Sequence, residues 1–214
     1  MKRSTIFLLA VFILGGLFLL ATLLYRTGSG DGARRADPTL LVRMHAPTLG
    51  PTDAKVHIVE FIDPACETCR AFYPFVKQLM AANPRKIKLT TRHVPFHKGV
   101  DSVVRVLEAS KKQGKYWPTL EALLASQPQW AIHHEARIDL VWKNLEGTGL
   151  DLDRLRTEMN APEVDRNMRQ DADDAKALRV EKTPEYFVNG RRMETFGYDQ
   201  LKKLVQEELA TSYR

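Results

Sequence analysis

Residues 56–72 read VHIVEFIDPACETCRAF, and this stretch decides the fold. Its first seven residues form an almost continuous apolar run rich in β-branched side chains, which predicts a buried central strand over Val56–Ile62. Cys66 and Cys69 follow after a short loop, where a helix is expected to begin, and they are the only 2 cysteines of the chain. Unpaired N–H groups and the helix dipole at such a position favour a thiolate. The pattern therefore predicts a redox-active dithiol at a helix N-terminus.

Two other roles of the cysteine pair are weaker. A disulfide that closes so short a loop stabilises a fold little, because it removes little chain entropy. A structural zinc site needs four ligands, and the chain has no second cysteine pair. His93 and His97 flank Pro95, which excludes the helical spacing that would let both bind one metal ion. We therefore expect thiol–disulfide exchange without metal or bound cofactor, in which Cys66 attacks and Cys69 resolves mixed disulfides.

An uncharged apolar run, residues 6–24, lies near the N-terminus behind Lys2 and Arg3. As a helix this run extends about 28 Å, close to the thickness of a hydrocarbon core. It is longer than the apolar part of most signal peptides, and no clear cleavage site follows it. A retained transmembrane helix within residues 1–26 is therefore favoured over a cleaved signal peptide. Residues 27–45, which begin with a glycine-rich stretch, are expected to form a flexible tether.

Charge and cysteine usage indicate where the rest of the protein lies. Lys2 and Arg3 favour a cytoplasmic N-terminus, although Arg26, Arg34 and Arg35 on the other flank weaken this bias. Disulfide chemistry beside a membrane is typical of an oxidising compartment. We therefore expect a single-pass inner-membrane protein whose catalytic domain lies in the periplasm. The net charge of +6 is spread along the chain, and no basic run alternates with aromatic residues, so nucleic-acid binding is not expected.

The body of the chain, residues 46–214, is long enough for one domain with its own core. A helix is expected from residue 66 to about 82, kinked at Pro74, and a second strand over Ile87–His93. This strand–helix–strand order predicts a parallel pair with a right-handed crossover. From about 99 to 177 the apolar positions follow helical spacing, with no convincing strand. The sequence thus predicts an α/β fold with a helical insertion.

The C-terminal part is expected to return to the sheet. Residues 186–188 predict a strand, and Asn189-Gly190 is a strong signal for a type I′ hairpin turn. The return strand is expected over 191–195, and an amphipathic helix over 199–209 closes the domain. The core of the insertion is expected to hold the three tryptophans, Trp117, Trp130 and Trp142.

The element order and several motifs together resemble the DsbA-like branch of the thioredoxin fold, over about residues 47–209. The resemblance is carried by DAKVHIVEF at 53–61, by the Cys66–Cys69 pair, by GKYW at 114–117 and by TPEYFVNG at 183–190. A lone Cys-x-x-Cys motif is weak evidence, whereas the pair combined with this Thr-Pro segment is specific. The resemblance implies a thiol:disulfide oxidoreductase of the membrane-tethered DsbA-like type.

The resemblance also implies roles for residues around the dithiol. Pro184 is expected to form a cis peptide bond that faces the cysteines, and Thr183 to pair its backbone with an incoming client chain. An ordinary trans proline at the start of a strand is the alternative. Glu60 is implied to lie behind Cys69 and to relay its proton, unless the side chain points outward at the strand edge.

Glu67 and Thr68 lie between the cysteines, where DsbA-type oxidases commonly have Pro-His or Pro-Tyr. Both are expected to border the bound client. A carboxylate about 6 Å from the sulfur opposes a thiolate by roughly 1–2 kcal/mol. The helix N-terminus favours the thiolate by roughly 0.3–1 kcal/mol. This near-cancellation predicts a Cys66 less acidic than in a Pro-His enzyme, and hence a moderate oxidant or a reductant, unless Glu67 is turned to solvent.

We expect the protein to exchange disulfides with cysteines of exported proteins, and more in the oxidase than in the reductase or isomerase direction. An oxidase would pass electrons to a DsbB-like, quinone-linked membrane partner. A reductase or isomerase would receive them from a DsbD-like donor. The alternative class is a chaperone or copper(I)-binding module on the same scaffold, in which the thiolates bind metal or have no role.

Overall fold

The computed structural model describes residues 13–16, 18, 20, 22, 35–133 and 135–214. Residues 35–214 form one compact unit. Most of the expected membrane helix within residues 1–26, and residues 27–34 of the expected tether, lie outside the described residues. Among the residues described, none of the helices combines the length and the apolar character needed to cross a bilayer.

A five-stranded sheet forms the centre of the domain, in the order β1-β3-β2-β6-β7. β2 (Val56–Ile62) and β3 (Ile87–His93) pair in parallel, so both predicted strands and their parallel pairing are confirmed. β6 (Glu185–Val188) pairs antiparallel with β2, and β7 (Arg191–Arg192) pairs antiparallel with β6. The edge strand β1 (Thr48–Leu49) pairs antiparallel with β3 and was not predicted, because two residues are too few to show strand periodicity.

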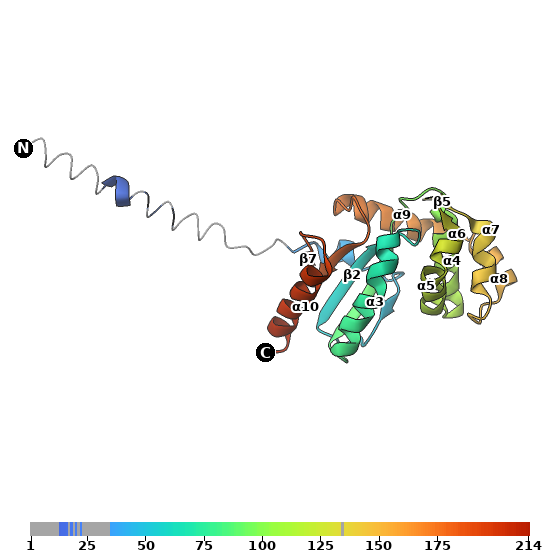
Figure 1. Ribbon diagram of the computed structural model, residues 1–214, viewed down its shortest axis with the longest axis horizontal. Helices are drawn as coiled ribbons and strands as arrows, with labels where there is room; N and C mark the ends of the chain where they lie inside the picture. Colours follow the sequence, from blue (N-terminus) through green and yellow to red (C-terminus); the bar gives the residue numbers. More distant parts are fainter. Residues whose placement is uncertain (1–12, 17, 19, 21, 23–34, 134) are drawn as a thin grey trace, which may run out of the picture. The chain divides into compact units, whose positions relative to one another are not determined.

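Side chains alternate between the two faces of β2. Ile58 belongs to the larger core cluster, which includes residues of α3 (Glu67–Ala82) and α10 (Tyr198–Ser212). Val59 belongs to a smaller cluster that includes residues of α9 (Pro162–Ala177). Figure 1 shows α3 and α10 beside each other across one face of the sheet. Because both faces are covered, β2 needs an almost continuous apolar sequence.

α3 begins directly after Cys66 and continues through Pro74 as one helix. Its buried side chains recur at helical spacing and form one stripe toward the core. They are Cys69, Phe72, Tyr73, Val76 and Leu79. The second cysteine of the pair therefore lies on the core side of the helix, one turn after the first.

Helices occupy most of the segment between β3 and β6, as predicted. They are α4 (Val100–Ser110), α5 (Tyr116–Ala125), α6 (Gln127–Trp130), α7 (Ile138–Val141), α8 (Leu152–Glu158) and α9, with short 3-10 helices at Lys111–Gln113 and Trp142–Leu145. The expectation of no strand here was wrong, because β4 (Ala131–Ile132) and β5 (Glu135–Ala136) pair antiparallel. Such short strands leave no period in the sequence. Trp130 is fully buried, and Trp117 and Trp142 pack partly buried against the same core.

The C-terminal hairpin turns at Asn189 and Gly190, whose φ angles of 48° and 84° are those that a type I′ turn requires. The return strand is shorter than predicted and ends at Arg192 rather than at residue 195. α10 covers the predicted closing helix and extends past both of its ends.

Residues 35–45 pack against the domain and are not a flexible tether. α2 (Pro38–Leu41) buries Leu41 in the smaller core cluster. The compact unit accordingly begins at Arg35 and not at residue 46. The glycines that suggested a tether all precede Arg35, whereas Pro38, which was also interpreted as a break in regular structure, is the first residue of α2.

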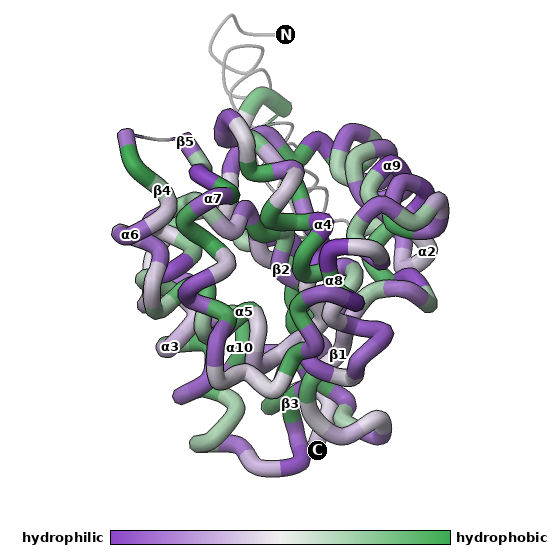
Figure 2. The backbone as a smooth tube through the Cα atoms, turned by 90° about the vertical axis from the view of Figure 1, so that its right-hand side faces the viewer, coloured by the Kyte–Doolittle hydropathy of each residue, from purple (hydrophilic) through white to green (hydrophobic). Residues whose placement is uncertain are grey.

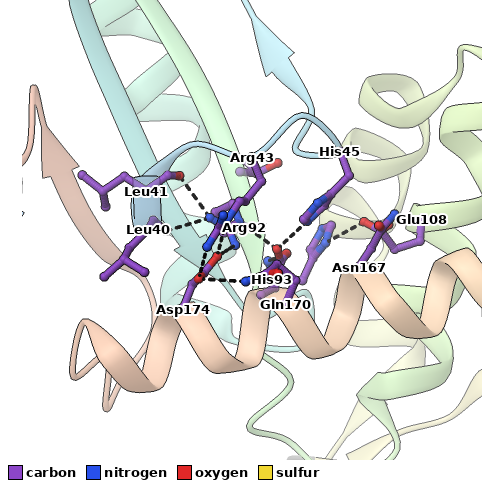
Figure 3. A network of polar contacts seen from close by, with 12 residues as sticks. Leu40, Leu41, Arg43, His45, Arg92, His93, Glu108, Asn167, Gln170 and Asp174 are labelled. Atoms are coloured by element: carbon purple, nitrogen blue, oxygen red, sulfur yellow. Dashed lines mark hydrogen bonds and ion pairs between the residues drawn. The ribbon is translucent and has the colours of Figure 1, made fainter. Parts of the chain in front are cut away.

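A buried arginine connects this segment to the sheet and to α9, whose chain Figure 2 shows as mainly hydrophilic. The Arg92 side chain has no exposed surface, and it donates to Asp171 at 2.8 Å and to Asp174 at 2.6 Å. It also donates to the Leu40 carbonyl oxygen at 2.9 Å. Arg43 adds two further hydrogen bonds to Asp174 (Figure 3). These contacts satisfy the polar groups that α9 buries, so a helix with few apolar residues can cover this face of the sheet.

Replacing Arg92 with methionine should lower the free energy of unfolding by about 3–5 kcal/mol, because Asp171 and Asp174 both lose a fully buried cationic partner. Arg43→Met is the matched control. The Arg43 side chain is 30% exposed and Asp174 keeps Arg92, so we expect a loss of about 1 kcal/mol or less. Urea unfolding followed by circular dichroism measures both variants. Equal losses would contradict the role given to Arg92.

Candidate active site

A buried carboxylate fixes the loop between β2 and the dithiol. Asp63 has no exposed surface, and its Oδ1 accepts the Ala65 N–H at 2.7 Å. Its Oδ2 accepts the N–H groups of Phe96 and His97 at 2.8 and 2.9 Å. The Asp63 carbonyl oxygen accepts the Cys66 N–H at 3.0 Å. These bonds tie the loop to the chain that leaves β3 and hold Cys66 at the position before α3.

Gln127 ties the same loop to the helical insertion. The residue is 1% exposed, and its Nε2 donates to the carbonyl oxygens of Pro64 at 2.7 Å and of Cys66 at 3.0 Å. Neither Asp63 nor Gln127 was predicted from the sequence as part of the site. An aspartate directly after a strand is a signal for a local turn and could have indicated Asp63. Gln127 contacts residues more than 60 positions away in the sequence, so no local sequence pattern indicates its role.

The two cysteines differ in exposure. Cys66 is 8% exposed, Cys69 is fully buried, and both thiols are free. The Cys66 sulfur lies 3.3 Å from the Thr183 carbonyl oxygen, and the Thr183–Pro184 peptide bond is cis. The segment that leads into β6 therefore faces the dithiol, although the two are 117 residues apart in the sequence.

Hydrogen bonds lower the pKa of Cys66 to about 5. The largest contribution is the hydrogen bond from the Cys69 thiol, which outweighs the opposing effect of burial. The backbone N–H groups of Cys69 and Thr68 and the side chain of Thr183 stabilise the thiolate further. Cys66 is therefore a thiolate at neutral pH, which is the form that attacks disulfides.

Cys69 is a thiol of the opposite kind. Burial raises its pKa well above the usual value, and the hydrogen bond to Cys66 and the nearby Glu60 raise it further. Cys69 therefore keeps its proton at neutral pH and becomes a nucleophile only when a base removes that proton. This asymmetry fits an attacking Cys66 and a resolving Cys69.

Glu60 lies in the middle of β2 with no exposed surface, so its side chain does not point outward at the strand edge. Tyr186, its neighbour on β6, donates its hydroxyl to Oε1 at 3.0 Å. Oε2 has no hydrogen-bond partner within the described part of the chain. Burial raises the pKa of Glu60 to about 8, against the lowering effect of the Tyr186 hydrogen bond and with a smaller increase from Cys66. The carboxyl is therefore mostly protonated at neutral pH.

The predicted near-cancellation at Cys66 is wrong. Glu67 and Thr68 are both exposed, and Glu67 is not among the groups that affect the pKa of Cys66 most strongly. Water and ions screen an exposed carboxylate, whereas the hydrogen bonds act directly on the Cys66 sulfur, which is largely buried. The alternative, with Glu67 turned to solvent, is the arrangement found. Cys66 is accordingly more acidic than the sequence suggested.

His93 and His97 are held by separate partners. The His93 ring nitrogen Nε2 lies 2.9 Å from the Tyr116 hydroxyl, and His97 Nδ1 lies 2.8 Å from Asp63 Oδ2. Among residues 35–133 and 135–214, no group of three or more His, Cys, Asp or Glu side chains is placed to hold a metal ion. The arrangement of Cys66 and Cys69 suits the exchange of sulfur–sulfur bonds.

The sheet order and the position of the dithiol define a thioredoxin-like domain. Residues 44–207 match the family model described as thioredoxin, so the chain belongs to this family. The solved structure of a thioredoxin-like oxidoreductase from Silicibacter pomeroyi DSS-3 is similar, with a TM-score of 0.70 and 30% identity over 80% of this chain and 97% of that chain. The DsbA of Xylella fastidiosa shares the fold, with a TM-score of 0.64 and 20% identity over 77% of this chain and 89% of that chain.

The chain is also similar in sequence to curated proteins of two kinds. Probable disulfide bond formation protein D of Bacillus anthracis is 29% identical over 173 residues, which cover 76% of this chain and 77% of that protein. The Na(+)/H(+) antiporter NhaA of Herminiimonas arsenicoxydans is 31% identical over 144 residues, which cover 67% of this chain and 22% of the antiporter. The chain therefore spans about a fifth of the length of the antiporter relatives that it matches.

We expect Cys66 to titrate with a pKa of about 5 in the reduced protein, as measured by the ultraviolet absorbance of the thiolate. Glu67→Gln should move this pKa by only about 0.3 unit or less, because the side chain is exposed and screened. Thr183→Val removes a hydroxyl that stabilises the thiolate and should raise the pKa by about half a unit or more. A fall of about one unit in Glu67→Gln would show that the carboxylate opposes the thiolate after all.

Glu60→Gln should remove a pH dependence from the stability of the oxidised protein, in which neither sulfur titrates. The folded state keeps the Glu60 proton up to a pH of about 8, whereas the unfolded chain loses it near the model value of 4.5. Stability therefore falls as pH rises between these two values, by at most about 5 kcal/mol. Denaturant unfolding at both ends of this range measures the fall, with exposed Glu67→Gln as control. Equal slopes in wild type and Glu60→Gln would contradict the assignment.

Proposed function

We propose that this protein is a thiol:disulfide oxidoreductase that oxidises cysteines of exported proteins. The observation that carries the proposal is the Cys66 sulfur, a thiolate at neutral pH, 3.3 Å from the Thr183 carbonyl oxygen. A reactive sulfur beside a backbone group that an extended chain can pair with is what disulfide exchange with a protein requires. The name of the Bacillus anthracis relative, probable disulfide bond formation protein D, supports the same reaction.

The acidity of Cys66 supports the oxidase direction. Stabilising the thiolate stabilises the reduced pair, so the disulfide becomes a stronger oxidant. A pKa of about 5 lies between the values of about 7 in thioredoxin and about 3.5 in DsbA. We therefore expect a reduction potential between those of these two proteins, roughly −270 and −120 mV.

Thr183 and Pro184 are proposed to receive the client chain. Thr183 is partly exposed, and its carbonyl oxygen lies beside the Cys66 sulfur. An extended client peptide that pairs its backbone with Thr183 as an added strand brings its own sulfur to Cys66. Glu67 and Thr68 are exposed on the same helix N-terminus and would border the bound peptide.

The reaction then runs in two exchanges. A client thiolate attacks the Cys66 sulfur of the disulfide, the bond between Cys66 and Cys69 breaks, and Cys69 leaves with the electron pair as a thiolate. Glu60, protonated at neutral pH, gives its proton to Cys69. A second client thiolate attacks the sulfur of its own partner cysteine in the mixed disulfide and releases Cys66 as a thiolate. The client gains a disulfide, and the protein leaves as a dithiol.

We propose a periplasmic domain held at the inner membrane by the apolar run 6–24. The run is long enough to span a membrane. Disulfides persist in oxidising compartments, which supports the periplasmic side. In the oxidase direction a DsbB-like membrane protein would reoxidise the pair. A DsbD-like donor would serve instead if the protein were a reductase or isomerase.

The oxidised protein should transfer its disulfide to a reduced peptide with two cysteines, and Cys66→Ser should abolish the transfer because the attacked sulfur is lost. Cys69→Ser should instead accumulate mixed disulfides when its Cys66 thiolate attacks disulfides of client proteins, because the sulfur that releases the adduct in that direction is missing. Non-reducing gels and mass spectrometry identify these adducts. Absence of adducts in Cys69→Ser would contradict the proposed enzyme.

The redox state of the pair in living cells tests the direction. Alkylation of cells quenched with acid should find Cys66 and Cys69 mostly as a disulfide, since an oxidase is kept oxidised by its partner. A mostly reduced pair would contradict the oxidase direction and favour a reductase or isomerase.

A further inference from the structure

A row of buried polar side chains crosses the sheet behind the dithiol. In the strand register Glu60 of β2 lies opposite Tyr186 of β6 on one side and opposite Thr91 of β3 on the other. Paired positions of neighbouring strands direct their side chains to the same face. All three residues have no exposed surface. Burying polar groups in the centre of a core costs free energy unless they form hydrogen bonds with one another. This row of buried polar side chains therefore needs an explanation.

The row continues beyond Thr91 into the helical insertion. Thr91 Oγ1 lies 2.6 Å from the hydroxyl of Tyr116, at the start of α5. The same hydroxyl lies 2.9 Å from Nε2 of His93, two residues further along β3. Tyr116 and His93 are 4% and 1% exposed, so these contacts run entirely through the core.

The row ends at a surface pocket. His93 Nδ1 lies 3.4 Å from Glu108 Oε1, and Glu108 Oε2 accepts hydrogen bonds from Lys111 and Asn167. Figure 3 shows His93 facing Glu108, with Asn167 next to the same carboxylate. Glu108, Lys111 and Asn167, with His45, are among the residues that line a surface pocket of about 290 Å³. A chain of groups that can bind or pass a proton therefore leads from β3 to solvent.

One step of the row is not a direct hydrogen bond in this structure, namely the step from Glu60 to Thr91. Glu60 Oε1 accepts from Tyr186, whereas Oε2 is buried without a partner in the described part of the chain. Neighbouring strands lie about 4.8 Å apart, a separation that a small movement of the carboxyl group or one bridging water spans. Glu60 thus lies at the start of the row by its register, with one carboxyl oxygen that has no hydrogen-bond partner in the described part of the chain.

The charges around the row suit proton transfer. The titratable groups near Glu60 come from three elements. They are Cys66, Cys69 and Tyr73 at the start and along α3, Tyr186 of β6 and Tyr116 of α5. Burial raises the pKa of Tyr73, Tyr116 and Tyr186, so their hydroxyls remain neutral and keep a proton to pass on.

At the far end of the row, Glu108 remains an anion. Burial opposes this charge, but the hydrogen bond and charge of His93, with Lys111, lower the pKa of Glu108 to about 2. His93 is also near the Asp171 carboxylate, which accepts its backbone N–H. Two carboxylates therefore lie close to His93, Glu108 at its ring and Asp171 at its backbone N–H.

We propose that Thr91, Tyr116 and His93 conduct protons between Glu60 and the pocket at Glu108. Cys69 can then gain or lose its proton while the dithiol remains covered by the client. This inference rests on the proposed thiol:disulfide exchange and assigns to that reaction a route for its proton. Residues 91, 116 and 93 act through Glu60 and do not touch the reacting sulfurs.

The route can be observed when the reduced protein reacts with an aromatic disulfide that releases a coloured thiolate. In the first step the Cys66 thiolate attacks the reagent and releases one aryl thiolate. In the second step the Cys69 S–H bond breaks and its proton passes to the Glu60 carboxylate. The Cys66–Cys69 bond forms, and the bond from Cys66 to the aryl sulfur breaks, with its electron pair leaving on a second aryl thiolate. Glu60 then returns the proton through the row to solvent.

The experiment compares Thr91→Val with Thr90→Val by stopped flow at about pH 6.5, where most Glu60 carboxyls hold a proton that must leave before Cys69 reacts. Thr91→Val should slow the second step at least about tenfold and leave the first unchanged. Thr90 is equally buried on the same strand, but its hydroxyl contacts Thr48 and His57 on the opposite face. Thr90→Val should therefore leave both steps within a factor of about two.

Two further variants separate proton conduction from a structural role. Thr91→Ser keeps the hydroxyl and should restore the second step, and Tyr116→Phe should slow it as Thr91→Val does. A second step in Thr91→Val and Tyr116→Phe as fast as in wild type would overturn the inference, and so would equal slowing in Thr90→Val. If wild type releases the first aryl thiolate but never the second, the proposed exchange itself fails. That result is distinct from a loss confined to the variants.

Discussion

The geometry of the site depends on the carboxylate of Asp63. It accepts hydrogen bonds from the backbone of the active-site loop and from the backbone that follows β3, and it has no exposed surface itself. The chain that follows β2 and the chain that follows β3 are thereby both fixed to the Asp63 side chain. Cys66 can occupy the position before α3 only because this loop is held in one shape. Gln127 fixes the loop from the opposite side through the carbonyl oxygens.

With the backbone fixed, two sulfurs on consecutive turns acquire opposite acidities. Cys66 lies where hydrogen-bond donors converge, whereas burial, the hydrogen bond to Cys66 and the neighbouring Glu60 raise the pKa of Cys69. Direct hydrogen bonds outweigh the charge of Glu67 because that charge is in water. The same reasoning explains Glu60. With no cation among the strongest influences on its pKa, burial dominates and leaves the carboxyl neutral.

The parts of the fold and of the site that could be predicted from the sequence are those that depend on residues close together in the chain. The apolar run of β2, the stripe of α3 and the Asn189-Gly190 turn each express a constraint within a few residues, and each was predicted. The position of Thr183 near Cys66 was implied only by the resemblance to a known fold, because spacing alone cannot bring together such distant residues. Asp63 and Gln127 were missed since their roles depend on tertiary contacts. The error at Glu67 had another source, because a sequence does not show which way a side chain on a helix turns.

The order of the strands has a consequence for synthesis. β2 pairs with β6, the Cys66 sulfur lies next to Thr183, and Arg43 binds Asp174. Each of these early segments therefore needs a partner that is synthesised more than a hundred residues later. Contacts between such distant segments form slowly, after the intervening chain has been produced. Until then Cys66 has only the donors of its own helix, the Cys69 thiol and the backbone N–H groups of Thr68 and Cys69, and lacks the side chain of Thr183. The side of the site on which Thr183 lies beside the Cys66 sulfur is therefore completed only after the last third of the domain has been made.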